Sequence, residues 1–212
     1  LMILAGTDSF PQRLGLLPSS VKWKQLRDDS LRIIYPDGHE ATAKRVASLM
    51  LKVAKMDPVT MEGRYVPISV LLQPHTNISN GYVGLAPYIS EFYLQPGENP
   101  FELGSLPWID LLAIHEYRHV QQVNAANRGI SHIVKTIFGD LAFTGLYNLS
   151  ITDWFREGDA VYAETKCTLQ GRGRLSSFTL PFREKLLMGE EWNYYKVRNG
   201  SYKEFTPSHY PM

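Results

Sequence analysis

Apolar residues along the chain follow two periodicities. Short β-branched and apolar runs bounded by Pro, Gly or Asn predict strands at 31–36, at 66–73 and within 80–97. Apolar positions at helical spacing predict long helices at about 39–56, 106–126 and 151–169. The pattern is weaker elsewhere: it predicts a short helix followed by an irregular stretch over 130–148, and a helical piece at 183–189.

The order of these elements predicts the fold class. Strands precede helices instead of alternating with them, which favours an α+β fold over a parallel α/β sheet. We expect a single domain over 1–212, with a small mixed sheet in about 1–105 and a mainly helical part in about 106–212.

Composition excludes several classes of protein. The 212 residues are 44% hydrophobic and 20% charged, as is ordinary for a globular domain. The net charge of +1 argues against a general nucleic-acid binder, and the one basic cluster, GRGR at 171–174, reads as a solvated loop. No apolar run approaches the ~20 residues of a membrane span. The single cysteine, Cys167, excludes an internal disulfide and a cysteine-based metal cluster.

The two ends of the sequence bear on completeness. The apolar start LMILAG is shorter than the ~7–15 residues of a signal-peptide core. The final stretch FTPSHYPM has no closing element, so we expect that the chain can be a piece of a longer protein with further domains.

The main chemical signal is AIHEYRHVQQ at 113–122. Positions i and i+4 of a helix lie one turn apart on one face, so His115 and His119 can offer imidazole nitrogens to one Zn²⁺ ion. Glu116 lies about 100° round the helix. There it can accept a proton from a water molecule at the metal without being a ligand.

A catalytic zinc needs a third protein ligand. The candidates downstream of His119 are His132, Asp140, Asp153, Glu157, Asp159 and Glu164. We interpret His132 as a structural or surface residue. Glu157 is followed by Gly158 and Ala160, small residues that let this helix approach another closely.

HEYRH together with WFREGDAVYAE resembles the gluzincin clan of zinc metallopeptidases, the thermolysin and aminopeptidase-N type. The resemblance covers about 113–122 and 152–164. It implies that Glu157, the glutamate of a W-x-x-E-G-x-A pattern, is the third zinc ligand, and that Glu116 is the general base.

The chain departs from the clan at several positions. Arg118 stands where an apolar residue is usual, so its side chain must reach solvent or a carboxylate. Val161 replaces the aspartate that follows the ligand glutamate by four in thermolysin. The carboxylate that orients a ligand histidine must then come from elsewhere, with Asp153 and Glu164 as candidates and solvated acids as the alternative for both.

Two further features complete the expected site. The resemblance implies a tyrosine that donates a hydrogen bond to the developing oxyanion, and Tyr210 in PSHYPM is the candidate, with Tyr202 as rival and simple aromatic packing as the alternative. The substrate backbone is expected along an edge strand over the site helix. We expect that strand in GLAPYISEFYL at 84–94, because Pro87 suits a sheet edge.

We therefore expect a zinc-dependent peptidase that hydrolyses peptide bonds of a peptide or protein substrate through a zinc-activated water. The absence of a G-x-M-E-N-like anchor for an amino terminus favours internal cleavage. The alternative is a non-catalytic domain that serves as a binding platform in a larger cell-envelope protein. The habit of the clan also suggests a location outside the cytoplasm or in the cell envelope.

Overall fold

The computed structural model describes residues 20–29, 31–56, 66–97, 103–189 and 193–199. The sheet and the first helix are built from the segments before residue 98. The bounds are β1 Trp23–Arg27, β2 Leu31–Pro36, α1 Glu40–Met56, β3 Ile68–Gln73, β4 Gly81–Leu85 and β5 Tyr88–Tyr93. The helical part follows with α3 Trp108–Ala126, α4 Ile130–Ser150, α5 Asp153–Cys167, the 3-10 turn η1 Arg172–Arg174, α6 Leu180–Leu187 and α7 Tyr194–Asn199.

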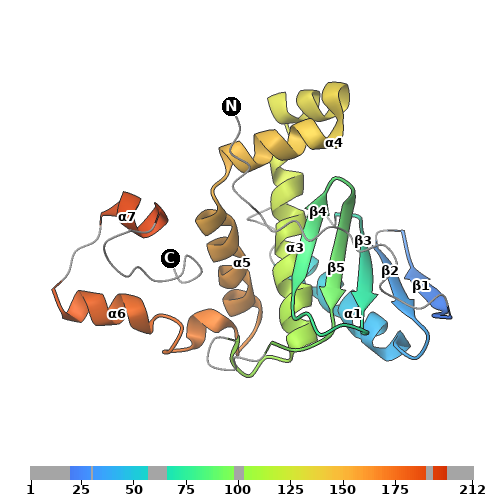
Figure 1. Ribbon diagram of the computed structural model, residues 1–212, viewed down its shortest axis with the longest axis horizontal. Coiled ribbons are helices and arrows are strands. Elements are labelled where there is room, and N and C mark those ends of the chain that lie inside the picture. Colours follow the sequence, from blue (N-terminus) through green and yellow to red (C-terminus); the bar gives the residue numbers. More distant parts are fainter. Residues whose placement is uncertain (1–19, 30, 57–65, 98–102, 190–192, 200–212) are drawn as a thin grey trace.

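The five strands form one mixed sheet in the order β1-β2-β3-β5-β4 (Figure 1). The pairs β2–β3 and β3–β5 are parallel, whereas β1–β2 and β4–β5 are antiparallel. Together with the helices that follow, this sheet confirms the predicted α+β fold.

The main core lies between one face of the sheet and helices α1 and α3. Alternate strand residues point into it, and the exposed fractions of Ile33, Val70 and Phe92 are all 0%. Met50 of α1 and Tyr117 of α3 meet them, and the Tyr117 hydroxyl accepts a hydrogen bond from the backbone N–H of Val66. Burial of these large side chains holds α3 against the sheet.

Helix α3 has neighbours on two sides, because it passes between the sheet and α5 (Figure 1). Its residues from Asp110 to Arg118 are all buried. In the part of the chain that the structure describes, every helix is too short or too polar to cross a membrane.

The predicted edge strand at 84–94 is wrong in its placement. The sheet edge is β4, Gly81–Leu85, while β5 pairs with both β3 and β4 and is internal. Pro87 lies in the two-residue turn between these strands, where its missing N–H removes no ladder hydrogen bond.

The irregular stretch expected within 130–148 is confined to Gly139, and the expectation is wrong for the residues around Gly145. Helix α4 runs from Ile130 to Ser150 and is kinked at Gly139, whose φ of 81° lies in the left-handed region. The chain resumes a helix after the kink and continues through Gly145.

Candidate metal centre

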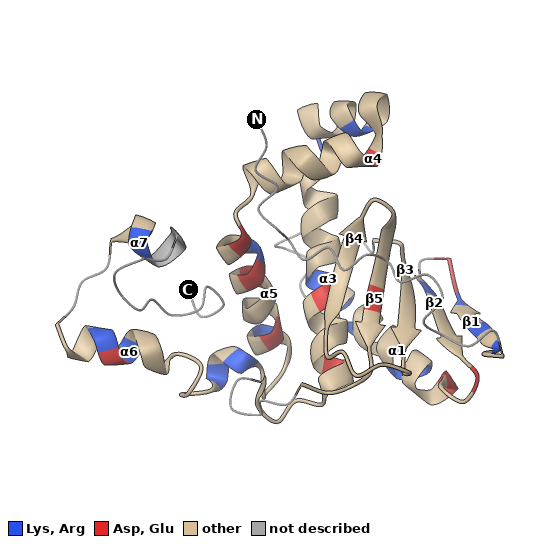
Figure 2. Cartoon of the chain, in the orientation of Figure 1, with Lys and Arg blue, Asp and Glu red and all other residues tan. Residues whose placement is uncertain are grey.

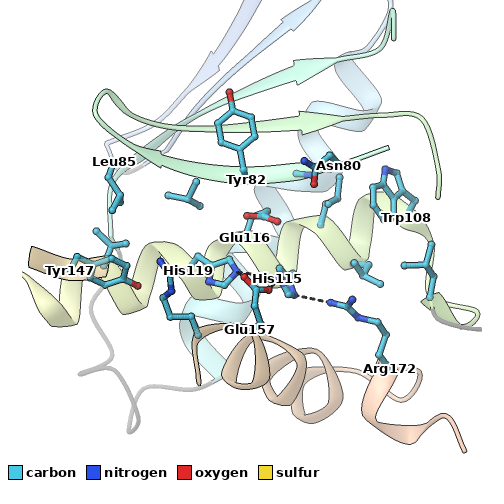
Figure 3. Close-up of a pocket in the computed structure, with 17 residues that line it drawn as sticks. Asn80, Tyr82, Leu85, Trp108, His115, Glu116, His119, Tyr147, Glu157 and Arg172 are labelled. Carbon is cyan, nitrogen blue, oxygen red and sulfur yellow. Dashed lines mark hydrogen bonds and ion pairs between the residues drawn. The ribbon is translucent and has the colours of Figure 1, made fainter. Parts of the chain in front are cut away.

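His115 and His119 lie on consecutive turns of α3, with their Nε2 atoms 3.1 Å apart. Glu157 of α5 approaches the same point: one carboxylate oxygen lies 3.1 Å from Nε2 of His115, and the other lies 3.6 Å from Nε2 of His119. These residues, the three that the sequence predicts as ligands, are brought together by the structure (Figure 3).

The spacing of these atoms suits a four-coordinate metal. Ligand atoms at ~2.0–2.1 Å from a tetrahedral zinc ion are separated by about 3.3 Å from one another. The separations between the two histidine nitrogens and Glu157, 3.1, 3.1 and 3.6 Å, scatter around this value. The cluster can therefore hold a metal ion with three protein ligands.

The outer nitrogen of each histidine has its own partner. Nδ1 of His115 lies 2.6 Å from Oε1 of Glu164 and 3.0 Å from a guanidinium nitrogen of Arg172, and Nδ1 of His119 lies 2.9 Å from Oε1 of Gln122. When Nδ1 carries the proton and donates it to these oxygens, Nε2 keeps its lone pair for a metal. Glu164 is thus the orienting carboxylate, whereas Asp153 is exposed and pairs with Arg156.

Arg172 balances the charge of Glu164, whose side chain is fully buried. The guanidinium Nε lies 2.9 Å from Oε2 of Glu164. Burial raises the pKa of Glu164, but the hydrogen bonds from Arg172 and His115 outweigh burial and lower it overall. The interpretation of 171–174 as a solvated loop is therefore wrong for Arg172, whose side chain is only 11% exposed.

The close approach of α5 to α3 is secured by polar contacts beside the cluster. Arg118 forms two hydrogen bonds with Asp159, of 2.7 and 2.9 Å. Gln122 donates to Asp159 and to the backbone oxygen of Arg156. The unusual arginine within the HEYRH stretch therefore reaches a carboxylate of the helix that carries Glu157.

Glu116 is buried beside the His115–His119–Glu157 cluster, and its Oε2 atom has no hydrogen-bond partner in the described structure. Burial raises the pKa of its carboxyl group, although His115 and His119 oppose the shift. A buried carboxylate oxygen without a partner is costly. A water molecule held at the cluster is the kind of donor that would satisfy it.

The protonation of the cluster depends on its mutual contacts. Burial lowers the pKa of His115, but hydrogen bonds with Glu157 and Glu164 outweigh burial and raise it to about 9. For Glu157, burial raises the pKa, whereas the contacts with His115 and His119 hold it well below its usual range. These contacts favour protonated His115 and ionised Glu157 when no metal is bound.

A cleft of about 270 Å³ opens over the cluster. The edge strand β4 forms one side, and α3 with Glu157 and Arg172 forms the other (Figure 3). Gly81 lies very close to the helix: an added Cβ would be 2.6 Å from Leu112 and 3.1 Å from Glu116. The cleft thus runs along β4, the edge of the sheet that the described strands form.

One candidate in the cleft was missed at the sequence level. Tyr147 of α4 lines the cleft, and its hydroxyl is directed towards His119 (Figure 3). The spacing of Phe143 and Tyr147, four residues apart on one helical face, is the signal that indicates an inward side. The expected donor Tyr210 and its rival Tyr202 lie outside the described residues.

Three of the remaining candidate ligands are exposed or paired elsewhere. His132 is exposed, Asp140 pairs with Lys135, and Asp159 is held by Arg118.

Comparison of the chain with protein-family models, with curated proteins and with solved structures found no match.

Proposed function

We propose that this protein is a zinc-dependent peptidase of the gluzincin type that cleaves peptide bonds within a chain. His115, His119 and Glu157 would hold the zinc ion, since two imidazoles and one carboxylate suit Zn²⁺ and leave a position for water or substrate. When bound, zinc supplies Lewis acidity that lowers the pKa of water and polarises a carbonyl group.

The observation that carries the proposal is the position of Glu116. Its Oε2 atom is buried, has no partner among the described residues and lies beside the three ligands. A carboxylate there can accept the proton of the attacking water and then deliver it to the leaving amine. Its raised pKa brings it closer to the range in which it can do both.

Two further groups have suitable positions for the reaction. The Tyr147 hydroxyl, directed into the cleft, can donate a hydrogen bond to the carbonyl oxygen as negative charge develops on it. Among the described strands, none pairs with β4 on the cleft side, so its backbone can bind an extended substrate by strand addition.

The charges of the cleft favour internal cleavage. Of the described residues that line it, the acidic ones are Glu116 and Glu157, and both are assigned to the chemistry. No further carboxylate is present among these lining residues to bind a substrate amino terminus. The other charged lining residues are Arg156 and Arg172.

The test compares zinc-loaded wild-type protein with Glu116→Gln on a peptide library, with products identified by mass spectrometry. Glutamine keeps the size of the side chain but cannot accept the proton, so hydrolysis should fall by ~10²-fold or more while zinc content is unchanged. Glu184→Gln, the same substitution at an exposed position of α6, is the matched control and should retain activity.

The outcomes separate the two function classes. Equal turnover by wild type and Glu116→Gln would show that another group, or a contaminant, does the chemistry. Zinc without turnover in the wild type would support the non-catalytic platform instead.

A further inference from the structure

A second hollow of about 460 Å³ lies beside the cleft, between the end of α3 and the two halves of the kinked helix α4. Its lining is mainly apolar and includes Ile130, Phe143, Leu146, Tyr147 and Ile151. Arg128 is the one charged residue among the described residues that line it.

The hollow and the cleft are joined through a shared apolar cluster. Val123, Phe143 and Tyr147 form a small core of their own, and Leu85 at the end of β4 packs against it. Tyr147 lines both spaces, while Val123 and Leu85 line the cleft. A chain lying along β4 therefore leads from the metal cluster directly to the hollow.

The size and character of the hollow indicate what can enter it. Pockets of ~300 Å³ and more hold small organic ligands, so this one has room for one or two large side chains. Ile130 at the rim is 77% exposed, and a bound apolar side chain would cover this surface. Figure 2 shows few charged positions along α4, so a charged side chain bound there would have few residues with which to form ion pairs.

We propose that the hollow is a substrate subsite that receives large apolar side chains of the bound peptide, on the Leu85 side of the metal cluster. This inference rests on the proposed peptidase function and adds a substrate class, namely chains with an apolar segment near the cleaved bond. Strand β4 runs four residues from Gly81, beside Glu116, to Leu85. At ~3.4 Å per residue, the apolar residues should lie about three to five positions from the cleaved bond.

The first experiment measures binding without turnover. The probes are fluorescein-labelled 12-residue peptides of Ser, Thr and Gln. Each peptide contains one pair of adjacent Phe residues, and the position of the pair shifts by one residue from peptide to peptide. The peptides are titrated into zinc-loaded Glu116→Gln protein. Binding should be about tenfold or more tighter when the Phe pair stands at one end than in a peptide without Phe. Equal affinity for all the peptides would overturn the inference.

Two variants of α4 test whether the preference for Phe arises at the hollow. Leu146→Arg places a charge in the hollow and should remove the preference for Phe. Leu149→Arg, the same substitution one turn away on a side chain that is 88% exposed and outside the lining, should keep it. Unfolding curves verify that both variants fold. If both variants lose the preference for Phe equally, the preference comes from the whole apolar surface of α4, as it would for binding of a lipid or of a second copy of the chain. That result would overturn the subsite.

Hydrolysis of the same peptides by wild type distinguishes this inference from the proposed function. Cleavage without a preference for Phe would contradict only the subsite. Phe-dependent binding at the hollow without cleavage by the wild type would contradict the peptidase function but leave an apolar peptide-binding site.

Discussion

Nδ1 of His115 and Oε1 of Glu164 lie 2.6 Å apart, although 49 positions separate the two residues in the sequence. Glu164 is fully buried, and Arg172 binds its carboxylate as well. The pair joins α3 to α5 and sets which nitrogen of His115 faces Glu157. Glu164 therefore links the orientation of the His115 ring to the packing of two helices.

We expect Glu164→Gln to weaken zinc binding by about 10- to 100-fold, because an amide polarises the imidazole less than a carboxylate does. The measurement is competition with a chelator of known affinity. Asp153 is the other acidic residue that the sequence offers as the partner of a ligand histidine, and its side chain is exposed. The control Asp153→Asn should therefore leave the zinc affinity unchanged. Equal affinities in Glu164→Gln and wild type would show that Glu164 has no part in holding the ligand.

Asp159→Ala should destabilise the fold by about 3 kcal/mol, since it leaves Arg118 without its main carboxylate partner. The Arg118 side chain is only 3% exposed, so water cannot replace the lost contacts. Asp153→Ala removes the exposed partner of Arg156 on the same helix and should cost less than about 1 kcal/mol. Urea unfolding measures both, and similar losses would argue against a structural role of the Arg118–Asp159 pair.

Two glycines of α4 should respond to alanine in opposite directions. Gly145 lies in the helix with open space around it, so Gly145→Ala should stabilise the protein by about 0.5–1 kcal/mol. Gly139 has a φ of 81°, and Gly139→Ala should cost about 1 kcal/mol or more. Thermal unfolding of the two variants gives the sign, and stabilisation by Gly139→Ala would show that the kink is not required.

Zinc binding should release protons. The pKa of His115 is raised from 6.5 to about 9 in the metal-free protein, so at pH 7.5 its imidazole is mostly protonated and must lose a proton to become a ligand. About one proton should appear per zinc ion in calorimetric titrations with buffers of different ionisation enthalpy. Zinc affinity should therefore rise as the pH increases towards 9, and binding without proton release would contradict the protonated cluster.

The stability of the metal-free protein should change in the opposite sense. Because folding raises the pKa of His115, its contribution to stability is fully present below pH 6.5 and is lost as the pH rises through 9. Unfolding of metal-free protein across this range should show the decline, while zinc-loaded protein should not.

Local periodicity explains what could be predicted. The helices α3 and α5 follow from their apolar spacing, and the i, i+4 relation places two histidines on one side of α3 whatever surrounds it. Asp153, Glu157 and Glu164 share one stripe of α5. Which of them faces His115 depends on how α5 lies against α3, and this is a tertiary relationship that no local pattern contains.

The features that were missed are those that depend on distant contacts. Arg172 lies in a polar, glycine-containing stretch that is typical of a loop, yet Gly171 packs so closely on α5 that an added Cβ would be 2.5 Å from the backbone of Glu164. Tyr147 lies in the second half of α4, which the sequence pattern predicted to be irregular. The sheet edge was misplaced because Pro87 suits a turn as well as an edge.

The central claim is that His115, His119 and Glu157 hold one zinc ion. Crystals of zinc-loaded protein, measured on both sides of the zinc absorption edge, test it most directly. We predict one anomalous peak at about 2.0–2.2 Å from Nε2 of each histidine and from a carboxylate oxygen of Glu157. The account is contradicted if zinc-soaked crystals show no peak between α3 and α5, or show one whose third ligand is Glu164 or Asp159.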